Sequence, residues 1–175
     1  MGDELSIERH RRYAAEIPVS VCLVVTSDKI LSGIYSDEVT SLVARLVAKY
    51  GCELKNHTLV PNSRDAIASA VADSLRKCDV VVVSGGTGLG PKDLSVEVVR
   101  EICSKDIPGF GELFRYITFQ THGAVALASR AMACAVGDRL VFVTPGSPNA
   151  VELALDRLVL PEVRHLIAEL RGLRH

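Results

Sequence analysis

The chain has 175 residues, a formal net charge of −1, 48% apolar residues and 23% charged residues. This length and composition are typical of an ordinary globular domain, and the charge gives no electrostatic basis for binding nucleic acid or an anionic membrane surface. The sequence also contains no run of about 18 apolar residues that would span a bilayer. From the charge and the lack of such a run, we expect no nucleic-acid partner and no membrane partner.

Residues 1–17 are predicted to be a polar N-terminal arm, and residues 18–175 a single domain without linker or internal repeat. The arm lacks the central apolar stretch of a signal peptide, so we expect a cytoplasmic protein. The cysteines at positions 22, 52, 78, 103 and 134 are scattered, and no two form C-x-x-C. Buried, reduced thiols are the default interpretation, and disulfides remain open if the source is a hyperthermophile.

The first elements alternate between strand and helix patterns. Val19–Val25 is a nearly continuous apolar run, as expected for a strand buried on both faces. Apolar residues at helical spacing from Val39 to Tyr50 predict a helix with Ser36 as its N-cap and Gly51 just past its end. The more polar Cys52–Val60 is predicted to be a strand nearer a sheet edge.

The alternation continues along the chain. Residues 62–77 repeat the helical pattern, the valines at 80–83 predict a buried strand, and a helix is expected over 95–104. The Gly- and Ala-rich stretch 106–137 is expected to hold two short helices behind a loop at Pro108–Gly111.

The chain closes as a strand, a sharp turn and a long helix that Pro161 interrupts. This repeated order predicts an α/β fold, a three-layer α/β/α sandwich with a mostly parallel sheet.

The stretch SGGTGLGPKD, Ser84–Asp93, directly follows the valine strand. Glycines in such a loop let bare backbone approach a ligand and adopt positive φ angles. It is not a Walker A loop, because Pro91 stands where the lysine belongs, and it does not match G-x-G-x-x-G. Asp93 has two interpretations: it caps the next helix, or it holds Mg²⁺ against bound phosphates.

Two further loops are expected at the same edge of the sheet, where parallel α/β folds bind ligands. TPGSPN, Thr144–Asn149, offers Ser147 and Pro148 as N-cap and first residue of a helix, which is either an efficient turn or an anion site. TSDKILSG, Thr26–Gly33, supplies hydroxyls and Asp28. No Ser-His-Asp group, nucleophile elbow or Cys/His metal cluster is evident in the sequence.

Three motifs in order along the chain carry a resemblance: SGGTGLGPKDLSVE, IPGFGELFR and SRAMACAVGDRLVFVTPGSPNAVELAL. They resemble the molybdenum cofactor biosynthesis family, which includes the MogA and MoaB proteins and the G and E domains of gephyrin-like proteins. The opening VVTSDKILSGIYSDE is similar to the family's N-terminal strand and loop, so the match covers roughly Val19 to Leu170. The absence of extra domains favours the small stand-alone type.

The resemblance implies a three-layer α/β fold that binds molybdopterin, a dithiolene pterin phosphate. In the catalytically assigned branch, Mg²⁺ and ATP serve to adenylylate the terminal phosphate of molybdopterin, and pyrophosphate is released. Molybdenum or tungsten is later inserted into the product, so a molybdenum-insertion partner protein is also implied. Such a reaction orients two anions and neutralises their repulsion, a task suited to glycine loops and a metal-binding carboxylate.

The resemblance also implies the site residues. Asp93 matches the acid expected to act with Mg²⁺, as a catalytic residue and metal ligand. The residues implied to bind molybdopterin and ATP lie in the matching motifs and are Ser27, Asp28, Ser84, Gly85, Gly86, Thr87, Gly88, Glu112, Arg115, Pro145, Gly146, Ser147 and Asn149.

One position departs from the family pattern. The adenylylating branch has a second acid after the second strand, in a Pro-Asp pattern, whereas LVPNSRDAI has Asn62 there. Asparagine keeps an acceptor oxygen but loses the negative charge. Asp65, about one helical turn on, would be a substitute acid, so Asn62 and Asp65 join Asp93 as candidate catalytic residues.

Three functions therefore remain open. The first is a molybdopterin adenylyltransferase, and the second is a MoaB-like protein that binds molybdopterin without transferring a nucleotide. A gephyrin-like scaffold role is the third, for which the chain shows no partner-binding extension. The resemblance, together with the Ala-rich segment Ala124–Ala135 suited to close helix packing, predicts a closed homo-oligomer, a trimer or hexamer.

Overall fold

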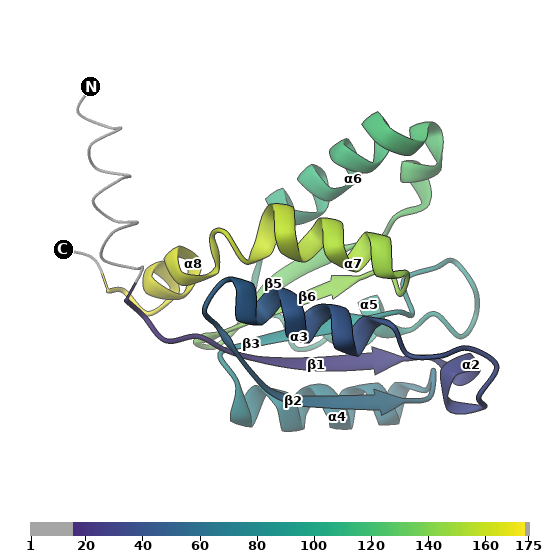
Figure 1. Ribbon diagram of the computed structural model, residues 1–175, viewed down its shortest axis with the longest axis horizontal. Helices are drawn as coiled ribbons and strands as arrows, with labels where there is room; N and C mark the ends of the chain where they lie inside the picture. The colour runs from purple at the N-terminus through teal and green to yellow at the C-terminus, as the bar shows by residue number, and fades with distance from the viewer. Residues whose placement is uncertain (1–15, 174–175) are drawn as a thin grey trace.

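The computed structural model describes residues 16–173, in which a central sheet is covered by helices on both faces (Figure 1). All but the last two residues of the predicted arm, 1–17, lie outside this range. The elements, in chain order, are β1 (Ser20–Thr26), α2 (Asp28–Leu31), α3 (Val39–Lys49), β2 (Glu53–Val60), α4 (Arg64–Lys77), β3 (Val80–Ser84), α5 (Ser95–Arg100), β4 (Lys105–Asp106), α6 (Pro108–His122), the 3₁₀ helix η1 (Gly123–Ala128), β5 (Met132–Val136), β6 (Arg139–Thr144), α7 (Pro148–Ala154), the π-helical turn η2 (Leu155–Val159) and α8 (Val163–Leu170). No helix between residues 16 and 173 has both the length and the apolar character needed to cross a membrane.

The sheet has six strands in the order β2-β1-β3-β6-β5-β4. The first four run parallel, β5 runs antiparallel to β6, and β4 antiparallel to β5. This confirms the predicted α/β sandwich and the place of β2 at an edge. The four parallel strands end at Thr26, Val60, Ser84 and Thr144. We call the side of the sheet formed by these carboxyl-terminal strand ends the carboxyl edge, and the side formed by the opposite strand ends the amino edge.

The two faces of β3 explain its unbroken run of valines. Val80 and Val82 belong to the core cluster with α3, α7 and α8, whereas Val81 and Val83 belong to the cluster with α4 and α5. Successive side chains of a strand point to opposite faces, so a strand covered on both sides needs apolar residues at every position. All four are no more than 1% exposed.

Helix α3 shows one correct and one wrong prediction. Gly51 has φ +65° and follows the helix as predicted. The N-terminal hydrogen bonds, however, go to Asp37 rather than Ser36, because the Asp37 carboxylate accepts the backbone N–H groups of Val39 and Thr40, each at 3.0 Å. A carboxylate at this end also interacts favourably with the helix dipole.

The stretch 106–137 was predicted wrongly. In place of two short helices behind a loop at Pro108–Gly111, Pro108 begins the 15-residue helix α6, the 3₁₀ helix η1 follows it, and Met132–Val136 forms strand β5. The Ala-rich segment Ala124–Ala135 is therefore divided: its first part lies in the 3₁₀ helix η1, and its last part enters the sheet in β5. Pairing with β6 and burial override the helix propensity of its alanines.

The C-terminal part agrees with its prediction. Strand β6 leads through a short turn into α7, and the helical run breaks around Pro161 before α8 begins at Val163. The helix predicted over 95–104 is shorter and ends at Arg100.

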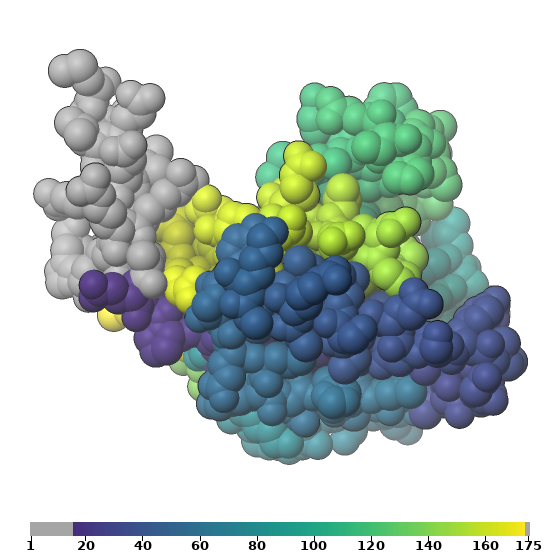
Figure 2. Space-filling model, in the orientation of Figure 1, coloured from purple at the N-terminus to yellow at the C-terminus, as the bar shows by residue number. Residues whose placement is uncertain are grey.

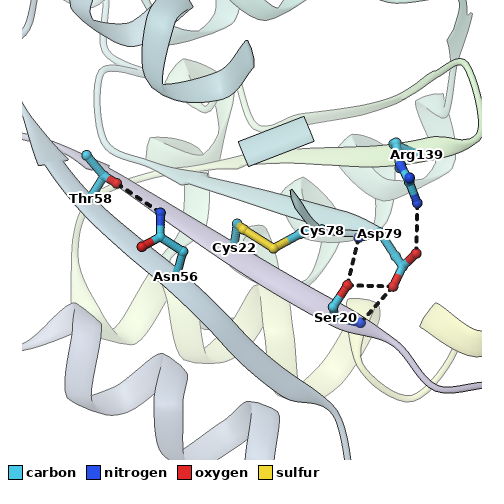
Figure 3. Close-up of a disulfide and its surroundings, with 7 residues drawn as sticks. All are labelled: Ser20, Cys22, Asn56, Thr58, Cys78, Asp79 and Arg139. Atoms are coloured by element: carbon cyan, nitrogen blue, oxygen red, sulfur yellow. Dashed lines mark hydrogen bonds and ion pairs between the residues drawn. A yellow bond between two sulfur atoms is a disulfide. The ribbon is translucent and has the colours of Figure 1, made fainter. Parts of the chain in front are cut away.

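Four of the five cysteines form disulfides, which corrects the default interpretation of reduced thiols. Cys22 in β1 bonds to Cys78 just before β3 (Figure 3), and Cys103 after α5 bonds to Cys134 in β5. The Cα atoms are 5.8 and 5.7 Å apart, within the usual range for disulfides. Cys52 is a free thiol.

Candidate functional site

The carboxyl edge carries a cleft of about 360 Å³. The cleft is lined by the loops that follow β1 and β6 and by Ser84 at the end of β3. The glycine loop after β3 touches the other two through Gly85, so the three predicted loops meet in space. The residues that line the cleft include Thr26, Ser27, Tyr35, Ser84, Gly146 and Ser147.

Two hydroxyls without a partner lie side by side at this edge. Ser84 and Thr144 are register neighbours at the ends of β3 and β6, and both are 0% exposed. Neither side-chain oxygen has a hydrogen-bond partner. A buried unpaired hydroxyl costs about 1–3 kcal/mol. Since Ser84 lines the cleft, a ligand oxygen placed there would satisfy it.

The glycine loop after β3 is shaped so that only glycine fits. Gly85 has φ +101°, and a Cβ there would lie 2.4 Å from the carbonyl oxygen of Thr26. Gly86 has φ +65°, and its Cβ would lie 2.4 Å from the Ser95 hydroxyl oxygen. A Cβ on Gly146 would lie 3.2 Å from the Cα of Gly85, so the loops after β3 and β6 touch through bare backbone.

Arg130 holds the glycine loop in place through hydrogen bonds to the loop backbone. Its Nε donates to the Thr87 carbonyl at 3.1 Å and an Nη donates to the Asp93 carbonyl at 3.0 Å. Its guanidinium also forms an ion pair with Glu97, and this hydrogen bond holds the pKa of Glu97 below its ordinary value. The site predictions missed Arg130, although it lies in the motif SRAMACAVG.

Asp93 is folded against the glycine loop. Its carboxylate accepts the Gly90 N–H at 3.0 Å, and a Cβ on Gly88 would lie 2.6 Å from Oδ2. The residue at the N-cap of α5 is Leu94, without any side-chain cap, so the capping interpretation of Asp93 is wrong. One carboxylate that is partly open to solvent fits Mg²⁺, which takes one or two carboxylates and completes its shell with substrate oxygens and water.

Asn62 connects the loops after β1 and β2. The Thr26 hydroxyl donates to Asn62 Oδ1, and the Asn62 N–H donates to Asp28 Oδ1 at 2.9 Å. Lys92, on the glycine loop, lies 3.4 Å from Asp28 Oδ2. The Asn62 N–H, with a smaller contribution from Lys92, lowers the pKa of Asp28. Thr26 and Lys92 are contacts that the motif comparison did not select.

Ser27 and Ser147 each follow a strand and are the N-cap residues of the short helices α2 and α7. Ser27 Oγ accepts the Ile30 N–H at 3.2 Å, and Ser147 Oγ accepts the Ala150 N–H at 3.3 Å. An accepting hydroxyl keeps its own proton to donate. Both serines can therefore cap a helix and donate to a ligand oxygen in the cleft.

Of the predicted site residues, the cleft lining includes Ser27, Ser84, Gly146 and Ser147; Asp28, Asn62, the glycine loop from Gly85 to Gly88 and Asp93 lie outside the lining, and so do the remaining predicted residues. Asp65 is exposed in the first turn of α4, Glu112 is exposed on α6, and Arg115 lines a different cavity. Pro145 and Asn149 flank the turn from β6 into α7. Within residues 16–173, no group of three or more His, Cys, Asp or Glu side chains forms a ready metal site.

The chain is similar to known proteins over most of its length. A family model described as a probable molybdopterin binding domain matches residues 22–165. Molybdenum cofactor biosynthesis protein B of Staphylococcus carnosus is 40% identical over 139 residues, covering 77% of this chain and 82% of that protein. The protein of the same name from Bacillus subtilis is 31% identical and covers 95% of this chain and 98% of that one.

Among solved structures, the tungsten cofactor synthesizing protein MoaB from Pyrococcus furiosus superposes with a TM-score of 0.82. It is 28% identical and the match covers 88% of this chain and 98% of that one. These similarities agree in fold and in family.

Proposed function

Because the chain belongs to the probable molybdopterin binding domain family and is a MogA/MoaB-type protein of molybdenum cofactor biosynthesis, we propose that its carboxyl edge binds molybdopterin and adenylylates the terminal phosphate using Mg-ATP. The observation that carries the proposal is the fully buried, unpartnered Ser84 hydroxyl, which lines the cleft and is followed directly by Gly85 and Gly86, where only glycine fits.

In this reaction an oxygen of the molybdopterin phosphate bonds to the α-phosphorus of ATP, the bond from that phosphorus to the β-phosphate oxygen breaks, and pyrophosphate leaves. Ser84, Ser27 and Ser147 would donate to phosphate oxygens and orient them. When bound through Asp93, Mg²⁺ supplies charge that offsets the repulsion between the two anions. Arg130 keeps the glycine loop and Asp93 in place.

The direct test is pyrophosphate release by the purified protein with molybdopterin, ATP and Mg²⁺. The proposal predicts release that needs all three components. A protein that binds molybdopterin tightly but releases no pyrophosphate would contradict the transfer step and leave binding intact.

Asn62 favours the second candidate, binding without transfer. Its side-chain oxygen already accepts the Thr26 hydroxyl, and it carries no charge for a metal. The exposed Asp65 shows no hydrogen bond or ion pair to the glycine loop in the described part of the chain. The same assay separates the candidates, because a binder shows saturable molybdopterin binding without turnover.

We also propose a closed homo-oligomer, a trimer or hexamer. The C-terminal end of helix α6 projects from the body of the molecule (green in Figures 1 and 2). Helix α6 and η1 together expose a group of large apolar side chains: Leu113, Tyr116, Phe119, Val125 and Leu127. Leu127 is 91% exposed. Such a patch on a soluble protein marks an interaction surface. A monomeric mass by light scattering at micromolar concentration would contradict this proposal.

A further inference from the structure

The two disulfides differ in how far solvent reaches them. Cys22 and Cys78 are 0% and 1% exposed. Cys103, by contrast, is partly exposed and lines a cavity of about 590 Å³ between α6, β5 and the end of α5, while its partner Cys134 is 0% exposed. Thiol–disulfide exchange needs an attacking thiolate that reaches one of the two sulfurs. The cavity gives such access to Cys103 in the folded protein, whereas burial denies it at the other disulfide.

The reduced form of the exposed pair has a hydrogen-bond acceptor already in place. Cys103 Sγ lies 3.2 Å from the carbonyl oxygen of Val99. A disulfide sulfur carries no proton, whereas a thiol is a weak donor. Reduction would therefore turn this contact into a hydrogen bond and would leave no new donor unpaired at Cys103. The buried Cys134 thiol would behave as a small apolar side chain in β5.

The disulfide fixes the end of α5 to the sheet. Helix α5 ends at Arg100, Cys103 follows it, and Cys134 lies in β5. The strand pairing next to this bond is that of β4, which has two residues, both exposed. Helix α5 itself has six residues, fewer than a helix needs to be stable alone. The covalent bond is therefore a main restraint on the position of α5.

Helix α5 in turn supports the glycine loop. The Ser95 N–H donates to the Gly86 carbonyl at 3.1 Å, and a Cβ on Gly86 would lie 2.4 Å from the Ser95 hydroxyl oxygen. Glu97 on the same helix pairs with Arg130, whose guanidinium also donates to the Asp93 carbonyl. These contacts connect the end of α5 to the loop of the proposed site.

We propose that Cys103–Cys134 is a site of reversible thiol–disulfide exchange with a dithiol reductant, and that its reduction loosens α5 and the glycine loop. One thiolate of the dithiol attacks Cys103 Sγ, the bond between the two cysteine sulfurs breaks, and Cys134 leaves as a thiolate that takes up a proton. The second thiol of the reductant then displaces Cys103 from the mixed disulfide. Two electrons and two protons pass to the protein, and the reductant becomes an internal disulfide. Only the consequence for ligands of the cleft rests on the function proposed above.

The test is reduction of the folded protein by dithiothreitol, followed by acid quenching and thiol counting by mass spectrometry. We expect the thiols of Cys52, Cys103 and Cys134 to appear well before those of Cys22 and Cys78. The exposed pair should be reduced on the order of 100-fold faster, because the buried pair reacts only after the sheet opens. Cys52→Ala is the matched control, and its exposed pair should be reduced at the wild-type rate.

Hydrogen exchange measures the consequence for the loop. Amides of residues 86–100 should exchange at least about tenfold faster after reduction, and reoxidation should restore slow exchange. The variant Cys103→Ser/Cys134→Ala should match reduced wild type with or without the reductant, since serine can donate to the same Val99 carbonyl. Reduction of both disulfides at one rate, or unchanged exchange over residues 86–100 once the exposed pair is reduced, overturns the proposal. These readouts do not require nucleotide transfer, so the failure of that reaction leaves them decisive.

Discussion

The two edges of the same sheet are built in opposite ways. At the amino edge, Asp79 accepts the Ser20 N–H at 2.8 Å and the Ser20 hydroxyl at 2.6 Å, and it pairs with Arg139 at 2.9 Å (Figure 3). Asp79 also pairs with Arg171. The disulfide between Cys22 and Cys78 lies beside this network.

At the carboxyl edge, strands β3 and β6 end in Ser84 and Thr144, whose buried hydroxyls have no partner. The loop that follows contains glycines at positive φ. The amino edge therefore stabilises the fold, whereas the carboxyl edge leaves polar groups unpaired, which under the proposed function a ligand would satisfy. Stability and binding are separated along the strands, so variants at the two edges should have different effects.

The largest effect on stability is expected from removing the disulfide of the amino edge. The double variant Cys22→Ala/Cys78→Ala should lose about 4 kcal/mol of unfolding free energy, because the bond closes a long loop in the unfolded chain. Urea unfolding measures the loss, and molybdopterin affinity should not change. As a check on the bonds, the unreduced denatured protein should show a single reactive thiol, Cys52; five reactive thiols would contradict both disulfides.

Gly85→Ala should damage the carboxyl edge. The added Cβ meets the Thr26 carbonyl and the φ of +101° strains alanine, so the loop must move. We expect molybdopterin affinity to fall on the order of 100-fold, about 2.7 kcal/mol, in equilibrium titration. Gly137→Ala is the matched control, since its φ is also positive but its Cβ meets nothing within 4 Å. Equal losses in both variants would show that backbone strain, and not the contact, is responsible.

Asp79 should make stability depend on pH. Partial burial raises its pKa, but the bonds from Ser20 and Arg171 outweigh this and lower the pKa to about 2. The lowered pKa stabilises the folded state by about 2 kcal/mol above the unfolded pKa near 3.8, and this is lost as the pH falls through about 2. Unfolding measured across this range in wild type and Asp79→Asn should show a difference that vanishes in acid. A difference that persists there would contradict this cause.

Asn62→Asp should have a smaller, favourable effect on the reaction. The new carboxylate can still accept the Thr26 hydroxyl, and it adds charge beside Asp28. We expect pyrophosphate release to rise on the order of 10-fold, about 1.4 kcal/mol of transition-state stabilisation. Equal rates would show that this charge is irrelevant, and turnover in the variant alone would identify the natural chain as a binder. Asp65→Ala, run beside it, reports whether Asp65 is the substitute acid.

The sequence predicted the parallel part of the fold well, because β1, β3 and β6 are buried on both faces and show it as unbroken apolar runs. It failed at β5, where the alanines of Ala133–Ala135 carry no strand signal and only pairing with β6 decides their conformation. The disulfides were also out of reach, since Cys22 and Cys78 are separated by 56 positions and meet only through the sheet.

For the site, the motifs located the loops but not the contacts between them. The hydrogen bond from Arg130 to the Thr87 carbonyl and the hydrogen bond from Thr26 to Asn62 each join segments far apart in the chain. A local sequence pattern does not reveal such contacts. The motif implied that Arg115 binds the substrates, but Arg115 lines a cavity between α6 and β5 that is separate from the cleft.

The most direct test of the account is Asp93→Asn. The amide oxygen can still accept the Gly90 N–H, so the loop should hold its shape while the metal-binding charge is gone. Pyrophosphate release should fall by at least about 100-fold, with molybdopterin affinity and melting temperature close to wild type. A variant that keeps its specific activity and loses thermal stability would show that Asp93 serves the fold, and would contradict the assignment of this edge as a metal-assisted transfer site.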